Sequence, residues 1–208
     1  KFTTTNDNID LVAMNYETRF WRNKDWLWTA DDDHAWRHLT QQHPDIPQQI
    51  LEEVDGVNMV VQAGGHCGLY TWQYCSAVDE VVTFEPDSWN LKCLKENLKE
   101  YNNVSIYPYA LGNEDRKCGI MRDRVNSGAT RVKRRGELLQ VTLDRFHLEP
   151  DLIHLDIEGM ERSALKGMLG TINTFKPAIV LERANGEDIL TDMGYKRHKQ
   201  FGLDWLYL

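Results

Sequence analysis

The sequence predicts an α/β fold: a mostly parallel, doubly wound sheet, preceded by an N-terminal helical cap. From Asn58 onward, short apolar runs rich in Val and Ile alternate with helical patterns, which is typical of a parallel sheet covered on both faces. Residues 1–55 differ, because they hold four of the seven tryptophans and no glycine. We therefore expect a helical cap over 1–55 and a core domain over 56–208.

The elements of the core follow from local patterns. Strands are expected where Val, Ile and aromatic residues gather between turn residues, over 58–63, 80–85, 104–111, 151–158, 177–182 and 203–208. Helices are expected between them, over 69–77, 88–101, 160–175 and 186–194. The helix over 88–101 is the clearest, since Leu91, Leu94 and Leu98 share one face.

Two further segments are less regular. Residues 117–123 and 137–146 are expected to form a hairpin-like insertion around a basic loop. Within the cap, residues 44–54 are expected to form a helix that begins at a proline.

Composition and charge exclude several classes of function. The formal charge of −8 and the pI near 5.4 argue against nucleic acid as a partner. No apolar stretch approaches the roughly 20 residues that span a bilayer. The four cysteines form no CxxC pair, so we expect neither zinc nor a disulfide framework, but reduced thiols in a cytoplasmic protein. The chain begins at Lys1, which favours a domain of a larger multi-enzyme polypeptide.

A glycine-rich turn follows the first strand of the core. The run MVVQAGGHCGLY (residues 59–70) contains Gly64, Gly65 and Gly68, which are candidate cofactor-binding residues. In parallel sheets, ligands bind at the carboxyl ends of the strands, beside such turns. The GxGxxG spacing of a dinucleotide site would require glycine at positions 66 and 69, where the chain has His66 and Leu69. The lysine of a nucleoside triphosphate loop is absent as well.

The next strand ends on an acid. Glu85 stands 21 positions after Gly64 and is followed by Pro86, and both are candidate cofactor-binding residues. An acid at that place can accept hydrogen bonds from both hydroxyls of a ribose. A glycine turn without the phosphate-binding spacing, followed by a ribose-binding carboxylate, suits an adenosine ligand that lacks a pyrophosphate. S-adenosylmethionine is the obvious candidate, and a plain tight turn is the alternative.

Four segments in order resemble one family. They are VVQAGGHCGLYT, VVTFEPDSWN, NVSIYPYALGNED and DLIHLDIEGMERSALKGM, and KPAIVLE and the closing MGYKRHKQFGLDWLYL also fit. The chain thus resembles the FkbM family of S-adenosylmethionine-dependent methyltransferases over roughly residues 56–208. The first motif departs from the usual pattern: Gln62 replaces an acid, Gly65 an alanine and His66 an asparagine.

The resemblance implies a fold and a cofactor site. The fold would be the Rossmann-like class I methyltransferase core. Glu85 would bind the ribose, Gly64 and Gly65 would approach the cofactor, and Ala110 and Leu111 would lie near the adenine.

The strand over 151–158 carries the catalytic candidates. His154, Asp156 and Glu158 share a parity, so their side chains should point to one side until the turn begins. A hydroxyl is a poor nucleophile until its proton is removed, so methyl transfer to oxygen needs a general base or a metal. Asp156, at the carboxyl edge, is the first choice, and Glu158 and His154 follow. A hydrogen-bonded core histidine is the alternative for His154.

The neighbouring strand adds a second carboxylate. The strand over 177–182 ends at Glu182 and should lie beside the strand that ends at Asp156. Asp156 and Glu182 could together bind Mg²⁺ or a similar divalent cation, with the acceptor oxygen as a further ligand. Alternatively, Asp156 could act as a base without metal, relayed through His154, and Glu182 could pair with Arg183.

One basic patch stands out in this acidic chain. Residues 122–137 carry six Arg or Lys. A solvated loop is the default interpretation, and contact with an anionic acceptor is the functional one. Ser127 and Arg131 are the candidate substrate-binding residues, because NSGAT resembles a segment of the family near the active site.

These observations favour an S-adenosylmethionine-dependent O-methyltransferase. The resemblance implies natural products and sugars as acceptors, and we expect a hydroxyl of a glycan, a nucleotide-sugar or a related small molecule. The alternative is a non-catalytic Rossmann-like binding or partner domain that has lost turnover. A nicotinamide-dependent oxidoreductase is disfavoured by the missing third glycine.

Overall fold

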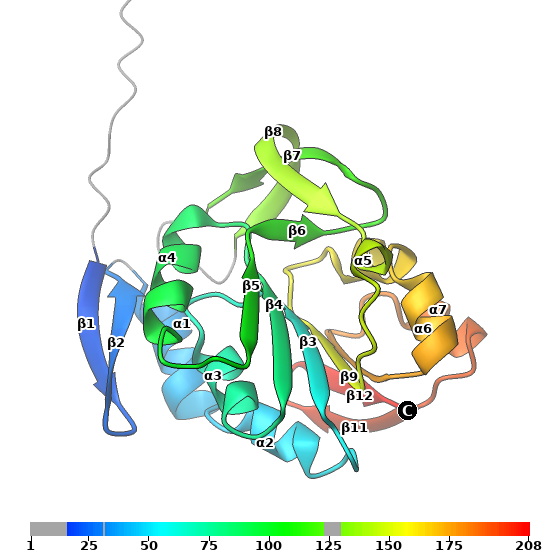
Figure 1. Ribbon diagram of the computed structural model, residues 1–208, viewed down its shortest axis with the longest axis horizontal. Coiled ribbons are helices and arrows are strands. Elements are labelled where there is room, and N and C mark those ends of the chain that lie inside the picture. The colour runs from blue at the N-terminus through cyan, green and yellow to red at the C-terminus, as the bar shows by residue number, and fades with distance from the viewer. Residues whose placement is uncertain (1–15, 31, 123–129) are drawn as a thin grey trace, which may run out of the picture.

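The computed structural model describes residues 16–30, 32–122 and 130–208, and its centre is a seven-stranded sheet (Figure 1). The strand order is β11-β12-β10-β9-β3-β4-β5. In that order the strands are Arg197–Phe201, Asp204–Tyr207, Ala178–Glu182, Leu152–Leu155, Met59–Ala63, Glu80–Phe84 and Val104–Tyr107. Strands β10, β9, β3, β4 and β5 are parallel, and β12 is antiparallel to both of its neighbours. The predicted α/β class with a mostly parallel sheet is confirmed.

Helices cover both faces of the sheet. Adjacent residues of one strand contribute to opposite faces: Val60 packs in the cluster with α2 (Ile46–Leu51) and α3 (Leu69–Cys75), whereas Val61 packs with α5 (Glu161–Lys166), α6 (Leu169–Phe175) and α7 (Glu187–Asp192). This alternation follows from the two-residue period of a strand. The arrangement is the doubly wound one that the sequence predicts.

A smaller sheet stands over one end of the large one. It has the order β6-β8-β7, with β6 at Tyr109–Leu111, β7 at Arg116–Met121 and β8 at Arg131–Val141, and it is followed by η3 (Asp144–Phe146). The strand predicted over 104–111 is therefore two strands in two sheets. Pro108 lies between them and has no N–H for a continuous ladder. The predicted basic loop is also corrected, since residues 131–137 belong to β8, which pairs with β7.

The N-terminal cap is only partly helical, which corrects the prediction for 1–55. Strands β1 (Tyr16–Trp21) and β2 (Lys24–Thr29) form a hairpin, whose turn residues Arg22 and Asn23 both have positive φ, as a tight hairpin turn requires. Buried Trp26 and Trp28 lie on either side of the partly exposed Leu27, which is the alternation of a strand. Helix α1 (Asp33–Arg37), η1 (His38–Gln42) and α2 follow.

The hairpin packs against the core rather than standing apart. Trp26 and Trp28 share one buried cluster with Cys67, Leu69 and Cys93, and the hairpin lies beside α4 (Ser88–Asn97) in Figure 1. The division of the chain at residue 55 stays a prediction.

Two smaller differences concern the second half of the chain. The helix predicted over 160–175 is split into α5 and α6 at Gly167, where a Cβ would stand 1.9 Å from the carbonyl oxygen of Gly112. Strand β11 was not predicted, because four of its five residues are polar and exposed and only pairing with β12 makes it a strand. No helix in the described ranges has the length and apolar character needed to cross a bilayer.

Candidate functional site

A pocket with a volume of about 330 Å³ lies at the carboxyl ends of β3, β4, β9 and β10. Parallel strands expose their ligand-binding turns at this edge. The small sheet contributes Ile120 and Val132 to its wall, and α1 and η1 contribute another side. The pocket brings together nine of the predicted site residues: Gly64, Gly65, Glu85, Pro86, Ala110, Leu111, Asp156, Glu158 and Glu182.

The glycine turn is held tightly at the bottom of this pocket. The amide groups of Gly64 and Gly65 both donate to the carbonyl oxygen of Phe84, at 3.1 Å. Gly64 has φ +90°, and a Cβ on it would lie 1.9 Å from the carbonyl oxygen of Asp156. A Cβ on Gly65 would lie 2.6 Å from Oγ1 of Thr83. Gly64 therefore requires glycine for both its backbone conformation and its space, whereas a Cβ at position 65 would require the side chain of Thr83 to move.

Gly68 and Gln62 have different roles in the turn. Gly68 does not line the pocket; it is the N-cap of α3, with φ +95°. Gln62, which replaces the acid of the family pattern, lines the pocket but is 2% exposed. Its Oε1 accepts a hydrogen bond from the hydroxyl of Thr71 at 2.6 Å. The buried side chain of Gln62 thus connects the end of β3 to α3.

Glu85 is fixed by two backbone hydrogen bonds. Its Oε2 accepts from the amide of His66 and its Oε1 from the amide of Asp87, both at 2.8 Å. Each carboxylate oxygen has two lone pairs, so each retains one for a ligand in the pocket. Burial raises the pKa of Glu85 to about 7. Pro86, Ala110 and Leu111 line the pocket near this carboxylate and provide apolar surface.

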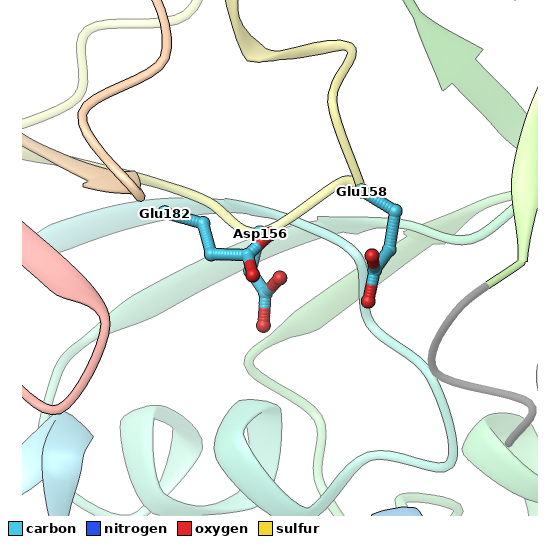
Figure 2. A group of neighbouring side chains, drawn as sticks. All are labelled: Asp156, Glu158 and Glu182. Atoms are coloured by element: carbon cyan, nitrogen blue, oxygen red, sulfur yellow. The ribbon is translucent and has the colours of Figure 1, made fainter.

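Three carboxylates gather at the ends of β9 and β10. In Figure 2 the side chains of Asp156, Glu158 and Glu182 point toward one another, and an oxygen from each lies within 4.8 Å of the others. Burial, together with the charges of Asp204 and Glu158, raises the pKa of Asp156 to about 8. Burial and the charge of Asp156 raise the pKa of Glu182 to about 8. The cluster therefore retains protons near neutral pH in the absence of a cation.

One basic side chain touches this cluster directly. Arg183 lines the pocket and forms an ion pair with Glu182. Arg183 and Ala184 both have positive φ, at 49° and 56°. Two consecutive non-glycine residues in this conformation are strained, and such strain gathers at functional sites. From the sequence, Arg183 is expected only as a surface partner of Glu182.

Glu161 organises the loop that presents the acids. It is 1% exposed, and its Oε1 accepts the backbone amides of Ile157 at 3.0 Å and of Gly159 at 3.1 Å. Its Oε2 accepts from the side-chain amide of Asn185 at 2.6 Å. The bonds close a turn in which Glu158 has φ +54°. Glu161 belongs to the Asp-x-Glu-Gly-x-Glu string, but the sequence did not reveal this bracing role.

The structure does not bring His154 to the pocket, which corrects its grouping with Asp156. His154 is fully buried, and a 2.8 Å hydrogen bond joins its Nδ1 to the hydroxyl of Tyr74 on α3. Burial lowers its pKa to about 4, so the ring is neutral. Strand β9 ends at Leu155, so Asp156 lies beyond the strand and the expected shared parity does not apply.

The predicted acceptor residues are only partly described. Ser127 lies outside the described residues. Arg131 is exposed and does not line the pocket, although its neighbours Thr130 and Val132 do. Its charge nevertheless lowers the pKa of Glu158, whose overall shift is upward because of burial. Arg131 is therefore near enough to act on the acid cluster electrostatically.

The N-terminal segment also reaches the glycine turn, which sequence analysis missed. Asp32 is completely buried, and its Oδ1 accepts the amide of Ala35 at 3.1 Å, capping α1. Its Oδ2 lies 3.3 Å from Nε2 of His66 in the glycine turn. The ring of His66 also packs on Trp28, with centroids 5.0 Å apart. A histidine at position 66 is thus matched by partners from the N-terminal segment.

Comparison with protein families identifies the chain. A model described as the methyltransferase FkbM domain matches residues 62–196, more than half of the sequence. The chain belongs to the FkbM methyltransferase family. The match begins at Gln62 and includes the glycine turn, Glu85 and the acid cluster. The comparison with curated proteins found no match to this chain.

Solved structures agree on the fold. An FkbM methyltransferase from Methylobacillus flagellatus is 20% identical, with a TM-score of 0.53, over 74% of this chain and 44% of that one. Trm5b from Pyrococcus abyssi is 13% identical, with a TM-score of 0.53, over 94% and 55%. A tRNA (uracil-54, C5)-methyltransferase from the same organism, in complex with S-adenosyl-L-homocysteine, is 13% identical, with a TM-score of 0.51, over 92% and 43%. This chain thus spans about half of each relative, and identities this low establish the class I methyltransferase fold alone.

Proposed function

We propose that this FkbM-family chain binds S-adenosylmethionine and methylates a hydroxyl of a sugar or a related small molecule. The main support for the proposal is that one pocket has a candidate cofactor site at one end and a cluster of carboxylates at the other. Glu85 and the glycine turn lie at the ends of β3 and β4, and the carboxylates lie at the ends of β9 and β10. Because these four strands are neighbours in the order β10-β9-β3-β4, a cofactor at one end and an acceptor at the other would meet above β9 and β3.

The cofactor end has features that suit an adenosine ligand. Glu85 retains two lone pairs for ribose hydroxyls after its two backbone hydrogen bonds. Gly64 and Gly65 line the pocket with backbone atoms, so a ligand can approach the turn closely. The apolar surfaces of Ala110 and Leu111 suit a purine ring.

The acceptor end has features that suit proton removal. The cofactor, when bound, supplies an electrophilic methyl carbon on a sulfonium. Asp156 would take the proton of the acceptor hydroxyl as its oxygen forms the new bond to carbon; the carbon–sulfur bond breaks and its electron pair stays on sulfur. Once ionised, a carboxylate with its pKa raised to about 8 is a stronger base than an ordinary aspartate. Glu182 and Glu158 would share the proton or pass it to solvent.

A divalent cation is the alternative to this metal-free base. Asp156, Glu158 and Glu182 offer oxygens within 4.8 Å of one another, which is a spacing that a cation could bridge. A bound cation would replace the retained protons and bind the acceptor oxygen directly. The two versions predict different responses to chelation: the base without metal predicts full activity in EDTA, and the cation predicts its loss and its return with Mg²⁺.

Calorimetric titration with S-adenosylhomocysteine, with NAD as a parallel control, tests the cofactor. We expect binding of the first in the micromolar range and none of the second. Transfer of a labelled methyl group from S-adenosylmethionine to a panel of glycosides, with EDTA or with Mg²⁺, then tests the reaction. Binding of the cofactor without transfer to any acceptor would favour a non-catalytic binding domain, and binding of NAD alone would refute the methyltransferase proposal.

A further inference from the structure

The residues that line the pocket come from two different parts of the sequence. The cofactor end and the acid cluster lie within residues 62–196, which match the family model. Another wall of the pocket lies outside that range. It comes from α1, from η1 and from Leu203 in the turn before β12, and it presents His34, His38 and Gln42 with Leu39.

This wall spans the acid cluster from one side to the other. Near its start, Asp32 caps α1 and contacts His66 at the end of β3, 3.3 Å away. Near its end, a Cβ on Gly202 would lie 2.9 Å from the ring of His43, so the segment after η1 packs on the turn before β12. The charge of Arg183, which follows β10, acts on His38. The segment therefore extends from β3 to β12, past the ends of β9 and β10 where the carboxylates lie.

The wall has a regular polar face. His34, His38 and Gln42 are spaced four residues apart, which places them in one row on a helix. Residues His38–Gln42 form a π-helical turn, closed by the hydrogen bond from the amide of His43 to the carbonyl oxygen of His38 at 2.9 Å. Such turns are rare in proteins overall, and those that occur are often found at functional sites.

The chemistry of this face suits neutral hydroxyl groups. Nδ1 of His38 is bonded to Oε1 of Gln42 at 3.2 Å, so Nδ1 carries the hydrogen and Nε2 offers a lone pair. Burial lowers the pKa of His38, so its ring is uncharged near neutral pH. Leu39 is partly buried, whereas Leu203 is 45% exposed at the rim, an apolar surface that a ring could cover. An anionic ring would add a further negative charge beside the three acids of the cluster, which disfavours its binding.

We infer that this face of α1 and η1 is the acceptor-binding wall, and that it takes a neutral, polyhydroxylated ring. The ring lies against Leu39 and Leu203, and Nε2 of His38 accepts a hydrogen bond from one hydroxyl while a neighbouring hydroxyl faces Asp156. The inference rests on the proposed function, because it assigns the acceptor of that reaction. It makes His34 and His38 specificity-determining residues outside the matched family region.

Binding of simple glycosides tests the inference without turnover. Methyl α-mannoside, methyl β-galactoside, methyl β-glucoside and methyl β-glucuronide are titrated by saturation-transfer NMR into the full chain saturated with S-adenosylhomocysteine. We expect at least one neutral glycoside to bind and the glucuronide to bind more weakly than the glucoside. In His38→Ala, the loss of one hydrogen bond should weaken binding about 3- to 10-fold, with the affinity for S-adenosylhomocysteine unchanged.

His198→Ala is the matched control, because His198 is a surface histidine paired with Glu53 outside the pocket. If His38→Ala also lowers thermal stability, the exposed His34 carries the test as His34→Ala. The inference is overturned if no neutral glycoside binds, if the glucuronide binds best, or if the histidine variants bind as wild type does. Glycosides that bind at the wall but accept no methyl group would instead refute the proposed function and leave the wall standing.

Discussion

Glu85 offers the sharpest test of the cofactor site, because its charge and its contacts predict a specific dependence on pH. Its carboxylate is 6% exposed, and burial raises its pKa to about 7 from the ordinary value of 4.5. Ribose hydroxyls donate to the ionised form. Below pH 7 the protonated carboxyl must therefore lose its proton before it binds, so the affinity for S-adenosylhomocysteine should fall about tenfold per pH unit.

Glu85→Gln should change both the affinity and this slope. The variant removes hydrogen bonds to a charged acceptor, worth about 1.5–3 kcal/mol, so affinity at pH 8 should fall roughly 10- to 100-fold. It also removes the group that titrates, so the slope below pH 7 should disappear. S-adenosylhomocysteine carries no sulfonium, which limits the influence of the acid cluster, and its own ionisation is the same for both proteins.

Isothermal titration calorimetry from pH 5.5 to 8.5 measures both quantities. Thermal unfolding over the same range serves as the control for the fold, because the amides of His66 and Asp87 lose part of their partner in the variant. The assignment of Glu85 to the ribose is refuted if the affinity is unchanged at pH 8, or if wild type and variant show the same slope.

The remaining predictions concern the acid cluster and the backbone that holds it. The folded protein binds the proton of Asp156 more tightly than the unfolded chain, so that stabilisation is lost as pH rises from about 4 to about 8. Asp156→Asn should raise the melting temperature at pH 8.5 and lower turnover roughly 100- to 10,000-fold; a less stable or fully active variant would contradict this. Gly64→Ala should abolish cofactor binding or folding. In chemical denaturation, Gly56→Ala should lower the free energy of unfolding by only about 1 kcal/mol, because Gly56 has φ +68° and no atom lies near its Cβ position. Equal effects of the two variants would exclude the contact of residue 64 with Asp156. Glu161→Gln turns an amide donor toward the backbone amides of the acid loop, so steady-state kinetics should show a lower kcat at an unchanged cofactor affinity, and unchanged kcat would remove its bracing role.

The sequence predicts the parts of this molecule that depend on local periodicity. Strands β3, β4, β9 and β10 lie where their apolar runs indicate, since each is buried on both faces. Because parallel strands end at one edge, the positions of Glu85, Asp156 and Glu182 in one pocket also follow from the sequence. Once the strands have been located in the sequence, the side chains that follow their carboxyl ends can therefore be assigned to the pocket.

What the sequence does not predict depends on contacts made across long separations. Trp26 and Trp28 lie in a hairpin that packs on Cys67 and Cys93, and these contacts are not visible in the local sequence pattern. His154 and Asp156 would point to the same side only in a longer strand, and β9 ends between them at Leu155. The wall around His38 reaches the pocket only through tertiary packing.

The two roles of the Asp32 carboxylate have a thermodynamic consequence. One oxygen holds the first turn of α1, and the other contacts the histidine of the glycine turn. A ligand that orders α1 and a ligand that orders the glycine turn therefore both stabilise the same conformation of the Asp32 side chain. Coupling of this kind is reciprocal, so the first ligand raises the affinity for the second by the same factor by which the second raises the affinity for the first. In the proposed reaction, the demethylated cofactor and the methylated acceptor would therefore each dissociate more readily once the other has left the pocket.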